Sequence, residues 1–239
     1  MTRRMLLGCV LMVGVGSAFG QTAPPAAPAP VAAPKPNPDW AQLGRYKDAN
    51  ATLPAHEAGR VVFYGDSITD AWAKDPAVFF PGKPFVGRGI SGQTTPQMLV
   101  RFRQDVIDLH PEAVVILAGT NDVAGNTGPM TVEQTEENFM SMAELAKVNH
   151  IKVVLCSIMP VLDYPWRRGM EPSPKIQAIN TWMKAYAKKS GFTYVDYYSA
   201  MDDGTGAAKA GLTGDGVHPT TEGYKLMEPL ALAGIEKSR

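Results

Sequence analysis

The sequence is poor in cysteine and has no excess of either charge. Cys9 and Cys156 are the two cysteines among 239 residues, so at most one disulfide can form within the chain. Its 23 Lys and Arg residues balance 23 Asp and Glu residues, which leaves no basic excess of the kind that nucleic-acid binding needs. The same balance gives no strong attraction to an anionic membrane surface. We therefore expect no nucleic-acid partner.

Several familiar motifs are also missing. The sequence contains no Gly-x-Ser-x-Gly elbow, which disfavours the α/β-hydrolase fold proper. It contains no Walker motif and no dinucleotide-binding glycine pattern. His56, His110 and His150 are scattered along the chain without metal-ligand spacing. We therefore expect neither a bound metal nor a cofactor.

The first 38 residues differ in composition from the rest. A basic start, an apolar stretch over residues 5–16 and small residues before Gln21 predict a secretory signal peptide over residues 1–20. Residues 21–38 consist largely of Pro and Ala, which favour extended backbone and predict a linker. We therefore expect an exported protein, periplasmic or secreted, with no stable membrane insertion after signal removal. An N-terminal segment retained as an anchor is the alternative.

Removal of the predicted signal peptide changes the charge and the cysteine content. Residues 1–20 hold Arg3 and Arg4 but no acidic residue, so 21 basic residues would face 23 acidic ones, a formal charge of −2. Cys156 would remain as the single cysteine, and it lies inside an apolar run. An internal disulfide is then impossible, so stability must come from the core, with Cys156 as a buried small side chain.

Strand-like and helix-like patterns alternate from residue 39 onwards. Asp39 can cap a short helix that carries Trp40, Leu43 and Tyr46. Alternation of this kind is typical of a parallel sheet covered by helices. We expect one α/β domain over residues 39–239, a flavodoxin-like three-layer α/β/α sandwich with a parallel sheet of about five strands. The patterns predict strands at 60–64, 84–88, 113–118, 151–158 and 193–197, and helices at 96–108, 132–149, 174–189 and about 220–235.

Four polar motifs occur at the ends of predicted strands or before the last helix. They are Gly65-Asp66-Ser67-Ile68-Thr69-Asp70, Gly89-Ile90-Ser91-Gly92-Gln93-Thr94, Gly119-Thr120-Asn121-Asp122 and Asp215-Gly216-Val217-His218. Since binding crevices of open α/β sheets lie at the carboxyl ends of the strands, we expect the four motifs to meet at one edge. A serine nucleophile needs a base, and the base needs an orienting acid. The motifs together supply all three kinds of side chain.

With these four motifs in this order, the chain resembles the SGNH, or GDSL-type, family of serine esterases and lipases. The resemblance implies a catalytic triad of Ser67, Asp215 and His218. It also implies an oxyanion hole made by the backbone N–H groups of Ser67 and Gly92 and the side-chain amide of Asn121. No step of that mechanism requires a metal or a cofactor.

The resemblance extends over roughly residues 60–236 and has two departures. Ile68 stands where the family name GDSL has leucine, and Gln93 stands where many members carry aspartate. The second change leaves the triad intact but lies beside the predicted oxyanion site. Asp66, next to the nucleophile, is expected to shape the turn through hydrogen bonds rather than to transfer protons.

One loop of the sequence bears on the identity of the substrate. The loop after the fourth predicted strand offers Tyr164 and Trp166 as faces for a sugar ring, and Arg167 as a cation for a carboxylate or phosphate. An equally simple interpretation is a loop packed on its own protein. The resemblance implies a small-molecule, glycan or lipid ester as substrate.

We expect an exported serine esterase that cleaves a short acyl ester, foremost acetyl on a carbohydrate, through an acyl-enzyme on Ser67. One alternative is a lipid acylhydrolase of the lysophospholipase or thioesterase type. Another is an acyltransferase to a sugar hydroxyl, since the covalent half-reaction is the same. A carbohydrate-binding module that has lost its activity is the alternative outside catalysis.

Overall fold

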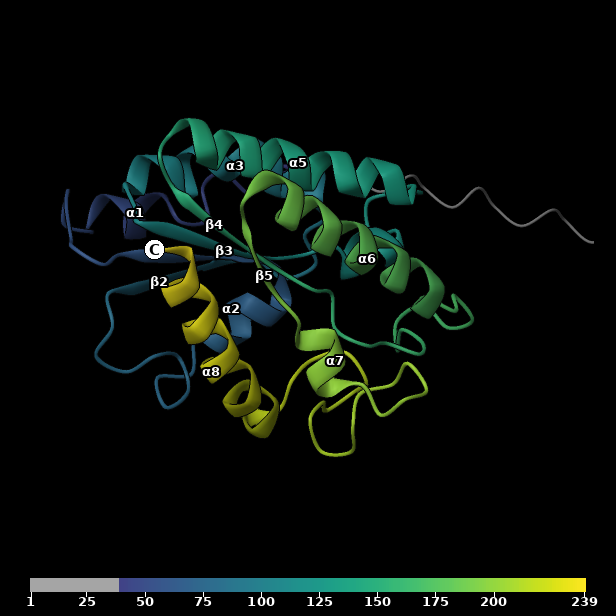
Figure 1. Cartoon of the computed structure of the whole chain (residues 1–239). Helices are drawn as coiled ribbons and strands as arrows, with labels where there is room; N and C mark the ends of the chain where they lie inside the picture. The colour runs from purple at the N-terminus through teal and green to yellow at the C-terminus, as the bar shows by residue number, and fades with distance from the viewer. Residues whose placement is uncertain (1–38) are drawn as a thin grey trace, which may run out of the picture. The chain divides into compact units, whose positions relative to one another are not determined.

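One parallel sheet forms the centre of the folded part of the chain (Figure 1). The computed structural model describes residues 39–239, so the predicted signal peptide and linker lie outside the described residues. The five strands are ordered β2-β1-β3-β4-β5, and every neighbouring pair is parallel. The predicted α/β class with a parallel sheet is therefore confirmed. The strands are β1 (Val61–Gly65), β2 (Phe85–Gly89), β3 (Ala113–Leu117), β4 (Lys152–Cys156) and β5 (Thr193–Val195).

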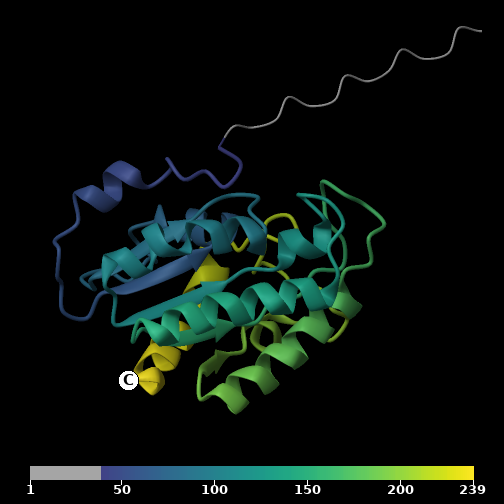
Figure 2. The same cartoon turned by 90° about the horizontal axis from the view of Figure 1, so that it is seen from above.

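Helices cover both faces of the sheet (Figures 1 and 2). One face carries α3 (Thr95–Asp105), α5 (Val132–Val148) and α6 (Ser173–Ser190). The other carries α2 (Ser67–Ala73), α7 (Tyr197–Met201) and α8 (Thr221–Ser238). The short elements α1 (Lys47–Ala51), η1 (Ile107–Leu109) and α4 (Thr120–Ala124) complete the connections.

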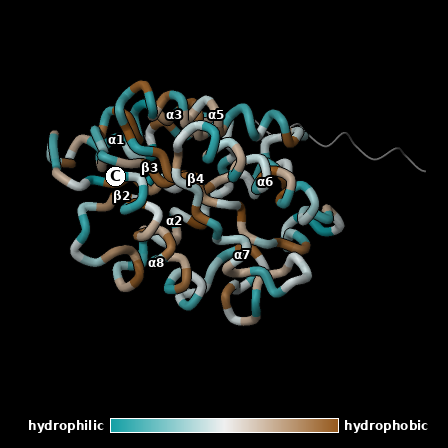
Figure 3. Tube along the Cα trace, viewed as in Figure 1, coloured by the Kyte–Doolittle hydropathy of each residue, from teal (hydrophilic) through white to brown (hydrophobic). Residues whose placement is uncertain are grey.

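The strands divide their side chains between two hydrophobic cores. In β1, Val62 and Tyr64 pack with α3, α5 and α6, whereas Val61 and Phe63 pack with α2 and α8. All residues of β1 and β3 are buried, as expected for central strands of a sheet covered on both sides. Figure 3 shows the hydrophobic residues gathered along the strands between the two helical layers. Cys156 is a free, fully buried thiol, as predicted, and burial raises its pKa to about 12.

The long helices follow the predicted patterns closely. Thr131 caps α5 and forms a capping box with Gln134. Phe139, Met142 and Ala146 of this helix are buried at the predicted helical spacing. An apolar stripe over residues 139–146 with a capping residue is thus enough to place such a helix from sequence.

The helix predicted from Asp39 is wrong in its position. The Asp39 carboxylate accepts the backbone N–H groups of Leu43 and Gly44, at 2.7 and 3.0 Å. Residues up to Tyr46 nevertheless form turns, and α1 begins only at Lys47. The physical reason is Gln42, whose φ of 54° lies in the left-handed region and interrupts a right-handed helix.

The packing of α2 against the sheet explains why the motif around Ser67 begins with a glycine, Gly65. A Cβ on Gly65 would lie 2.3 Å from Oγ1 of Thr69 and 2.5 Å from the carbonyl oxygen of Leu117. Only glycine allows α2 to fold back so closely over the end of β1. Ser67, the first residue of α2, is thereby brought to the carboxyl edge of the sheet.

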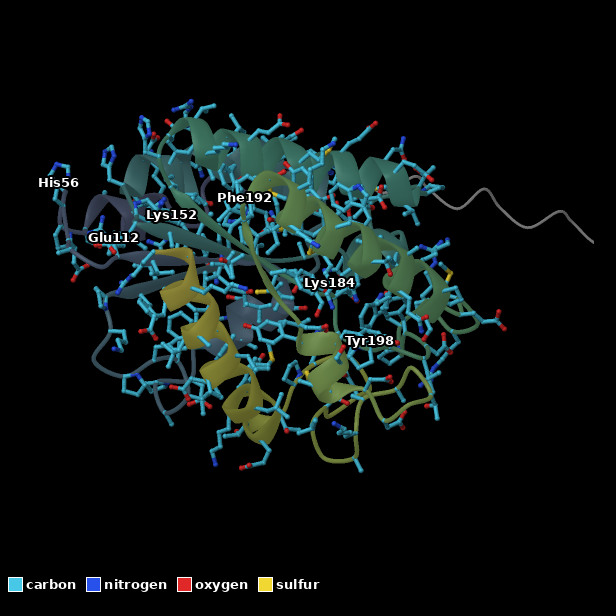
Figure 4. All side chains as sticks on the ribbon, in the orientation of Figure 1. His56, Glu112, Lys152, Lys184, Phe192 and Tyr198 are labelled. Atoms are coloured by element: carbon cyan, nitrogen blue, oxygen red, sulfur yellow. The ribbon has the colours of Figure 1, made fainter. Side chains whose placement is uncertain are left out.

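The two ends of the sheet carry different side chains. Figure 4 labels Glu112 and Lys152 at the beginning of β3 and β4, and Tyr198 just beyond the end of β5. The four predicted motifs all lie at the Tyr198 end, because each follows a strand or precedes α8. This edge is therefore where the candidate site is built.

Candidate active site

Ser67 lies in a strand–turn–helix that presents its side chain at the sheet edge. Asp66 is the N-cap of α2, and its Oδ1 accepts the backbone N–H of Ile68 at 3.0 Å. The backbone N–H of Ser67 belongs to the first turn of the helix, which its own hydrogen-bond ladder does not use. The turn thus offers both a hydroxyl and a backbone donor at one point.

The structure brings Ser67, His218 and Asp215 into one hydrogen-bonded chain. The Oγ of Ser67 lies 2.9 Å from Nε2 of His218, although 151 positions separate the two residues. The other ring nitrogen, Nδ1, lies 2.8 Å from Oδ2 of Asp215. This is the order of contacts that a serine nucleophile, its base and an orienting acid require.

Asp215 is held by its own loop. Its Oδ1 accepts the backbone N–H groups of Val217 and His218 at 3.0 and 2.8 Å. Partial burial raises the pKa of Asp215, but the hydrogen bonds from His218 and Val217 outweigh burial, so the pKa lies below its ordinary value. Asp215 is therefore a carboxylate under conditions in which an imidazole is neutral.

Contacts between α8 and α2 set the distance between the histidine and the serine. The hydroxyl of Tyr224 donates to the carbonyl oxygen of Ile68 at 2.9 Å, and its ring stacks on Trp72 with centroids 5.3 Å apart. Thr220 caps α8 by accepting the N–H of Gly223. His218 lies two residues before this cap, so docking α8 on α2 also positions His218 against Ser67.

Gly92 occupies a tight turn beside the serine. The N–H of Gln93 donates to the carbonyl oxygen of Ile90 at 3.3 Å, and Gly92 has a φ of 78°. A positive φ at the third position of such a turn favours glycine. A Cβ on Gly92 would meet no atom within 4 Å, so the backbone conformation, rather than crowding, is the reason for glycine here.

A buried arginine that the sequence analysis missed joins this turn to β1. Arg101 is fully buried, and its guanidinium donates to Oε1 of Gln93 at 2.6 Å and to the carbonyl oxygen of Gly65 at 3.0 Å. Asp105 lies 3.0 Å away and balances its charge. The sequence does hold one signal for this buried ion pair. Arg101 lies on the apolar face of a predicted helix, and Asp105 follows it four residues later. Gln93, the departure from the family pattern, therefore anchors the Gly92 turn.

Asn121 lies at the same edge, with its amide engaged inside the protein. Its Nδ2 donates to the carbonyl oxygen of Gln93 at 3.0 Å and to Oδ2 of Asp66 at 3.3 Å. Its Oδ1 accepts Nδ2 of Asn126 at 2.7 Å. To serve a substrate oxyanion, Asn121 must share the N–H that forms the longer bond, to Asp66. The sequence motif predicts the position of Asn121 but not these partners.

Asp66 contacts this amide and Asp122 follows Asn121 in the chain, and both carboxyls are buried. Burial raises the pKa of Asp66 to about 7, although the hydrogen bond from Ile68 and the nearby His218 act in the opposite direction. Burial likewise raises the pKa of Asp122 to about 6, against hydrogen bonds from Thr95. Near neutral pH the Asp66 carboxyl is protonated part of the time, and it then attracts the Asn121 N–H less strongly than a carboxylate does.

The three residues predicted to bind substrate differ in their exposure and in their partners. Tyr164 is fully buried and donates its hydroxyl proton to the carbonyl oxygen of Thr120 at 2.9 Å, so its ring offers no face to a sugar. Arg167 donates to the carbonyl oxygens of Ala124 and Gly125 and so caps the end of α4. Trp166 is 45% exposed, with its ring centroid 6.0 Å from that of His218. Of the three, Trp166 has a free aromatic surface beside the candidate triad.

Residues 39–239 contain no group of three or more His, Cys, Asp or Glu side chains arranged to hold a metal ion. The rings of His56 and His110 lie 5.5 Å apart, and Figure 4 places His56 at the Glu112 end of the sheet. No helix within the described part of the chain is long and apolar enough to cross a membrane.

Comparison with known proteins adds independent observations. A model of the GDSL-like lipase/acylhydrolase family matches residues 63–226. The crystal structure of a GDSL-like lipase from Bacteroides thetaiotaomicron VPI-5482 is 48% identical, has a TM-score of 0.81, and matches over 83% of this chain and 99% of that one. An acylhydrolase candidate from Bacteroides fragilis NCTC 9343 is 47% identical, with a TM-score of 0.81 over 84% of this chain and 99% of that one.

A curated relative matches over a shorter stretch. It is an uncharacterized lipoprotein, YqeF, of Bacillus subtilis (strain 168), 30% identical over 111 residues. The match includes 45% of this chain and 46% of the relative, so the chain spans about half the length of that protein.

Proposed function

This chain belongs to the GDSL-like lipase/acylhydrolase family and is a serine ester hydrolase, and from this premise we propose that it removes short acyl groups, foremost acetyl, from carbohydrate esters. We assign the nucleophile to Ser67, the base to His218 and the orienting acid to Asp215. The observation that carries this assignment is the pair of contacts at 2.9 and 2.8 Å through the two nitrogens of His218.

In the acylation half-reaction, Oγ of Ser67 attacks the ester carbonyl carbon while Nε2 of His218 takes the hydroxyl proton. The C=O double bond becomes a C–O⁻ single bond, and Asp215 stabilises the imidazolium through Nδ1–H. The intermediate then collapses, the bond to the alcohol oxygen breaks, and His218 returns its proton to that oxygen. An acyl ester on Ser67 and a free alcohol result.

The oxyanion needs donors that are already oriented. We assign this role to the backbone N–H groups of Ser67 and Gly92 and to Nδ2 of Asn121. The positive φ of Gly92 and the anchoring of Gln93 by Arg101 keep the second donor in place. Removal of one such donor typically costs about 3–4 kcal/mol of transition-state stabilisation.

Deacylation repeats the same chemistry with a new nucleophile. Water enters where the alcohol left, gives a proton to His218 and attacks the acyl carbon, and the carboxylic acid leaves while Ser67 regains its proton. A sugar hydroxyl in the same place would make the enzyme an acyltransferase. Product analysis with and without a sugar acceptor distinguishes the two, since an acylated acceptor appears only in the second case.

The position of Trp166 supports a carbohydrate as the alcohol. The leaving oxygen receives its proton from His218, so the alcohol must lie on the His218 side of Ser67. Trp166 presents an exposed ring on that side, 6.0 Å from the His218 ring. The flat face of an indole is suited to stacking on a sugar ring, and its N–H is occupied by Oδ1 of Asn126 at 3.2 Å.

A panel of p-nitrophenyl esters from acetate to dodecanoate, with acetylated xylan and lysophosphatidylcholine, tests the substrate class. We expect kcat/KM to be at least about tenfold higher for acetate than for octanoate. Trp166→Ala should raise KM for acetylated xylooligosaccharides and leave KM for ethyl acetate unchanged, because ethanol has no ring to stack. Leu162→Ala, at an exposed position of the same loop, is the matched control.

Faster turnover of long acyl chains, or of lysophosphatidylcholine, would instead establish the lipid acylhydrolase alternative. An equal rise in KM for both acetyl substrates in Trp166→Ala would remove the sugar-stacking role from Trp166.

We further propose that the protein works outside the cytoplasm, after cleavage before Gln21. The basic start, apolar stretch and small residues of the first 20 positions support cleavage at this site. The lipoprotein description of the Bacillus subtilis relative supports export alone. Mass spectrometry of the protein recovered from its native cell should show Gln21 at the N-terminus. An intact Met1, or a diacylglycerol on Cys9, would contradict cleavage at this site.

A further inference from the structure

Asn126 forms two hydrogen bonds to Asn121, one to its side-chain amide and one to its backbone. Its side-chain Nδ2 donates to Oδ1 of Asn121 at 2.7 Å, and its backbone N–H donates to the carbonyl oxygen of Asn121 at 3.0 Å. Its Nδ2 also lies 3.5 Å from the carbonyl oxygen of Gly92. Asn126 is therefore placed between two of the three groups assigned to the oxyanion hole, although none of the four sequence motifs includes it.

An asparagine amide has two orientations that differ by exchange of its oxygen and nitrogen. In the observed orientation, Nδ2 of Asn121 faces Asp66 and Gln93, and Oδ1 faces the donor on Asn126. In the reversed orientation, Oδ1 would face the carbonyl oxygen of Gln93, which can only accept, and Nδ2 would face the donor on Asn126. The bond from Asn126 thus opposes reversal of the amide.

Asn126 is itself fixed from both sides. It follows Gly125, which ends α4 in the left-handed conformation with a φ of 68°. Arg167 donates to the carbonyl oxygen of Gly125 at 3.0 Å, so the end of α4 is clamped. On the outer side, Nε1–H of Trp166 donates to Oδ1 of Asn126 at 3.2 Å, which directs Nδ2 of Asn126 inward to Asn121.

We infer that Asn126 is a positioning residue for ester hydrolysis, which holds the Asn121 amide in the orientation that donates to the oxyanion. Trp166 orients Asn126 in turn, so the aromatic surface beside His218 is coupled to the oxyanion donor through one side chain. This inference rests on the proposed role of Asn121. It assigns to Asn126 no contact with the reacting atoms.

Kinetics of Asn126→Ala with p-nitrophenyl acetate test the inference. We expect kcat to fall by about tenfold with KM nearly unchanged, because the lost orientation matters chiefly in the transition state. Asn126 is exposed and lies in a loop, so thermal unfolding should stay close to the wild-type temperature. The kcat of Asn126→Asp should fall at least as far as that of Asn126→Ala. The aspartate keeps the acceptor for Trp166 but turns a carboxylate oxygen toward Oδ1 of Asn121.

A double-mutant cycle with Asn121→Ala separates this role from a general effect on the loop. Asn121→Ala should lower kcat on the order of 10²-fold. Adding Asn126→Ala to that variant should then change kcat by less than about twofold, because Asn126 acts through Asn121. Thr127→Ala is the matched control: it perturbs the same loop, where its hydroxyl bonds to Thr94, and should keep the wild-type kcat.

The outcomes are distinct. Wild-type kcat in Asn121→Ala would overturn the oxyanion assignment of Asn121, and the inference with it. A loss of kcat in Asn121→Ala together with wild-type kcat in Asn126→Ala would overturn the inference and leave the oxyanion assignment of Asn121 in place. A full tenfold loss on adding Asn126→Ala to Asn121→Ala would also overturn it, because Asn126 would then act by another route. Trp166→Phe, which keeps a ring but removes the N–H, should show a smaller loss of kcat than Asn126→Ala.

Discussion

Replacing Ser67 with alanine is expected to lower kcat by about 10³-fold or more, since members of a triad act as a unit. The hydroxyl is the group 2.9 Å from Nε2 of His218, and without it no acyl-enzyme can form. The fold should be unaffected, because Ser67 is only partly buried and the cap of α2 is supplied by Asp66. Steady-state kinetics with p-nitrophenyl acetate, and thermal unfolding of the same preparation, measure the two effects.

A serine-reactive phosphonate provides a second, independent readout. It should add one phosphonyl group to the wild-type protein, on Ser67, and none to Ser67→Ala. Ser199→Ala, at an exposed position in α7, is the matched control and should be labelled and active like the wild type. Undiminished hydrolysis by pure Ser67→Ala would rule out Ser67 as the nucleophile.

The fold was predictable where burial leaves a periodic trace in the sequence. The fully buried strands β1 and β3 read as continuous apolar runs, and α5 carries a capping box and an apolar stripe. The short helices α2, α4 and α7 escaped prediction because five to seven residues are too few to show a helical period. The starts of α2 and α7 are instead set by single capping side chains, Asp66 and Asp196.

The candidate site was predictable only in part, for a related reason. Serine, histidine and carboxylate at strand ends form a recognisable pattern, and the structure brings Ser67, His218 and Asp215 together. Arg101 escaped prediction because it acts largely on backbone carbonyl oxygens, which any residue type supplies. The burial of Tyr164 could not be predicted from sequence either, because its hydroxyl bonds to the backbone of Thr120 in a distant segment. Sequence indicates which chemistry is present, whereas packing decides which side chains face the substrate.

Asp215→Asn is expected to lower kcat by about 10³-fold or more while the loop keeps its conformation. The carbonyl oxygen of the substituted amide can still accept the N–H groups that Oδ1 of Asp215 accepts from Val217 and His218. An amide N–H then replaces Oδ2 and faces Nδ1 of His218, which must become an acceptor. The ring proton moves to Nε2, where it blocks proton transfer from Ser67. The loss therefore arises from the wrong tautomer of His218 and not from a missing contact.

Measurements on Asp215→Asn across a range of pH separate this effect from a loss of stability. The pKa of Asp215 lies below its ordinary value of 3.8, so the ionised carboxylate stabilises the fold above that range, and the contribution is lost as the pH falls through the folded-state pKa. The difference in Tm between wild type and Asp215→Asn should therefore shrink on acidification, whereas the loss of kcat should persist at the pH of maximal wild-type activity. Asp203→Asn, a change of equal charge in another exposed turn of the described chain, should retain wild-type kcat. If Asp215→Asn kept more than about a tenth of the wild-type kcat, the orientation of His218 by Asp215 would contribute too little for the triad assignment to stand.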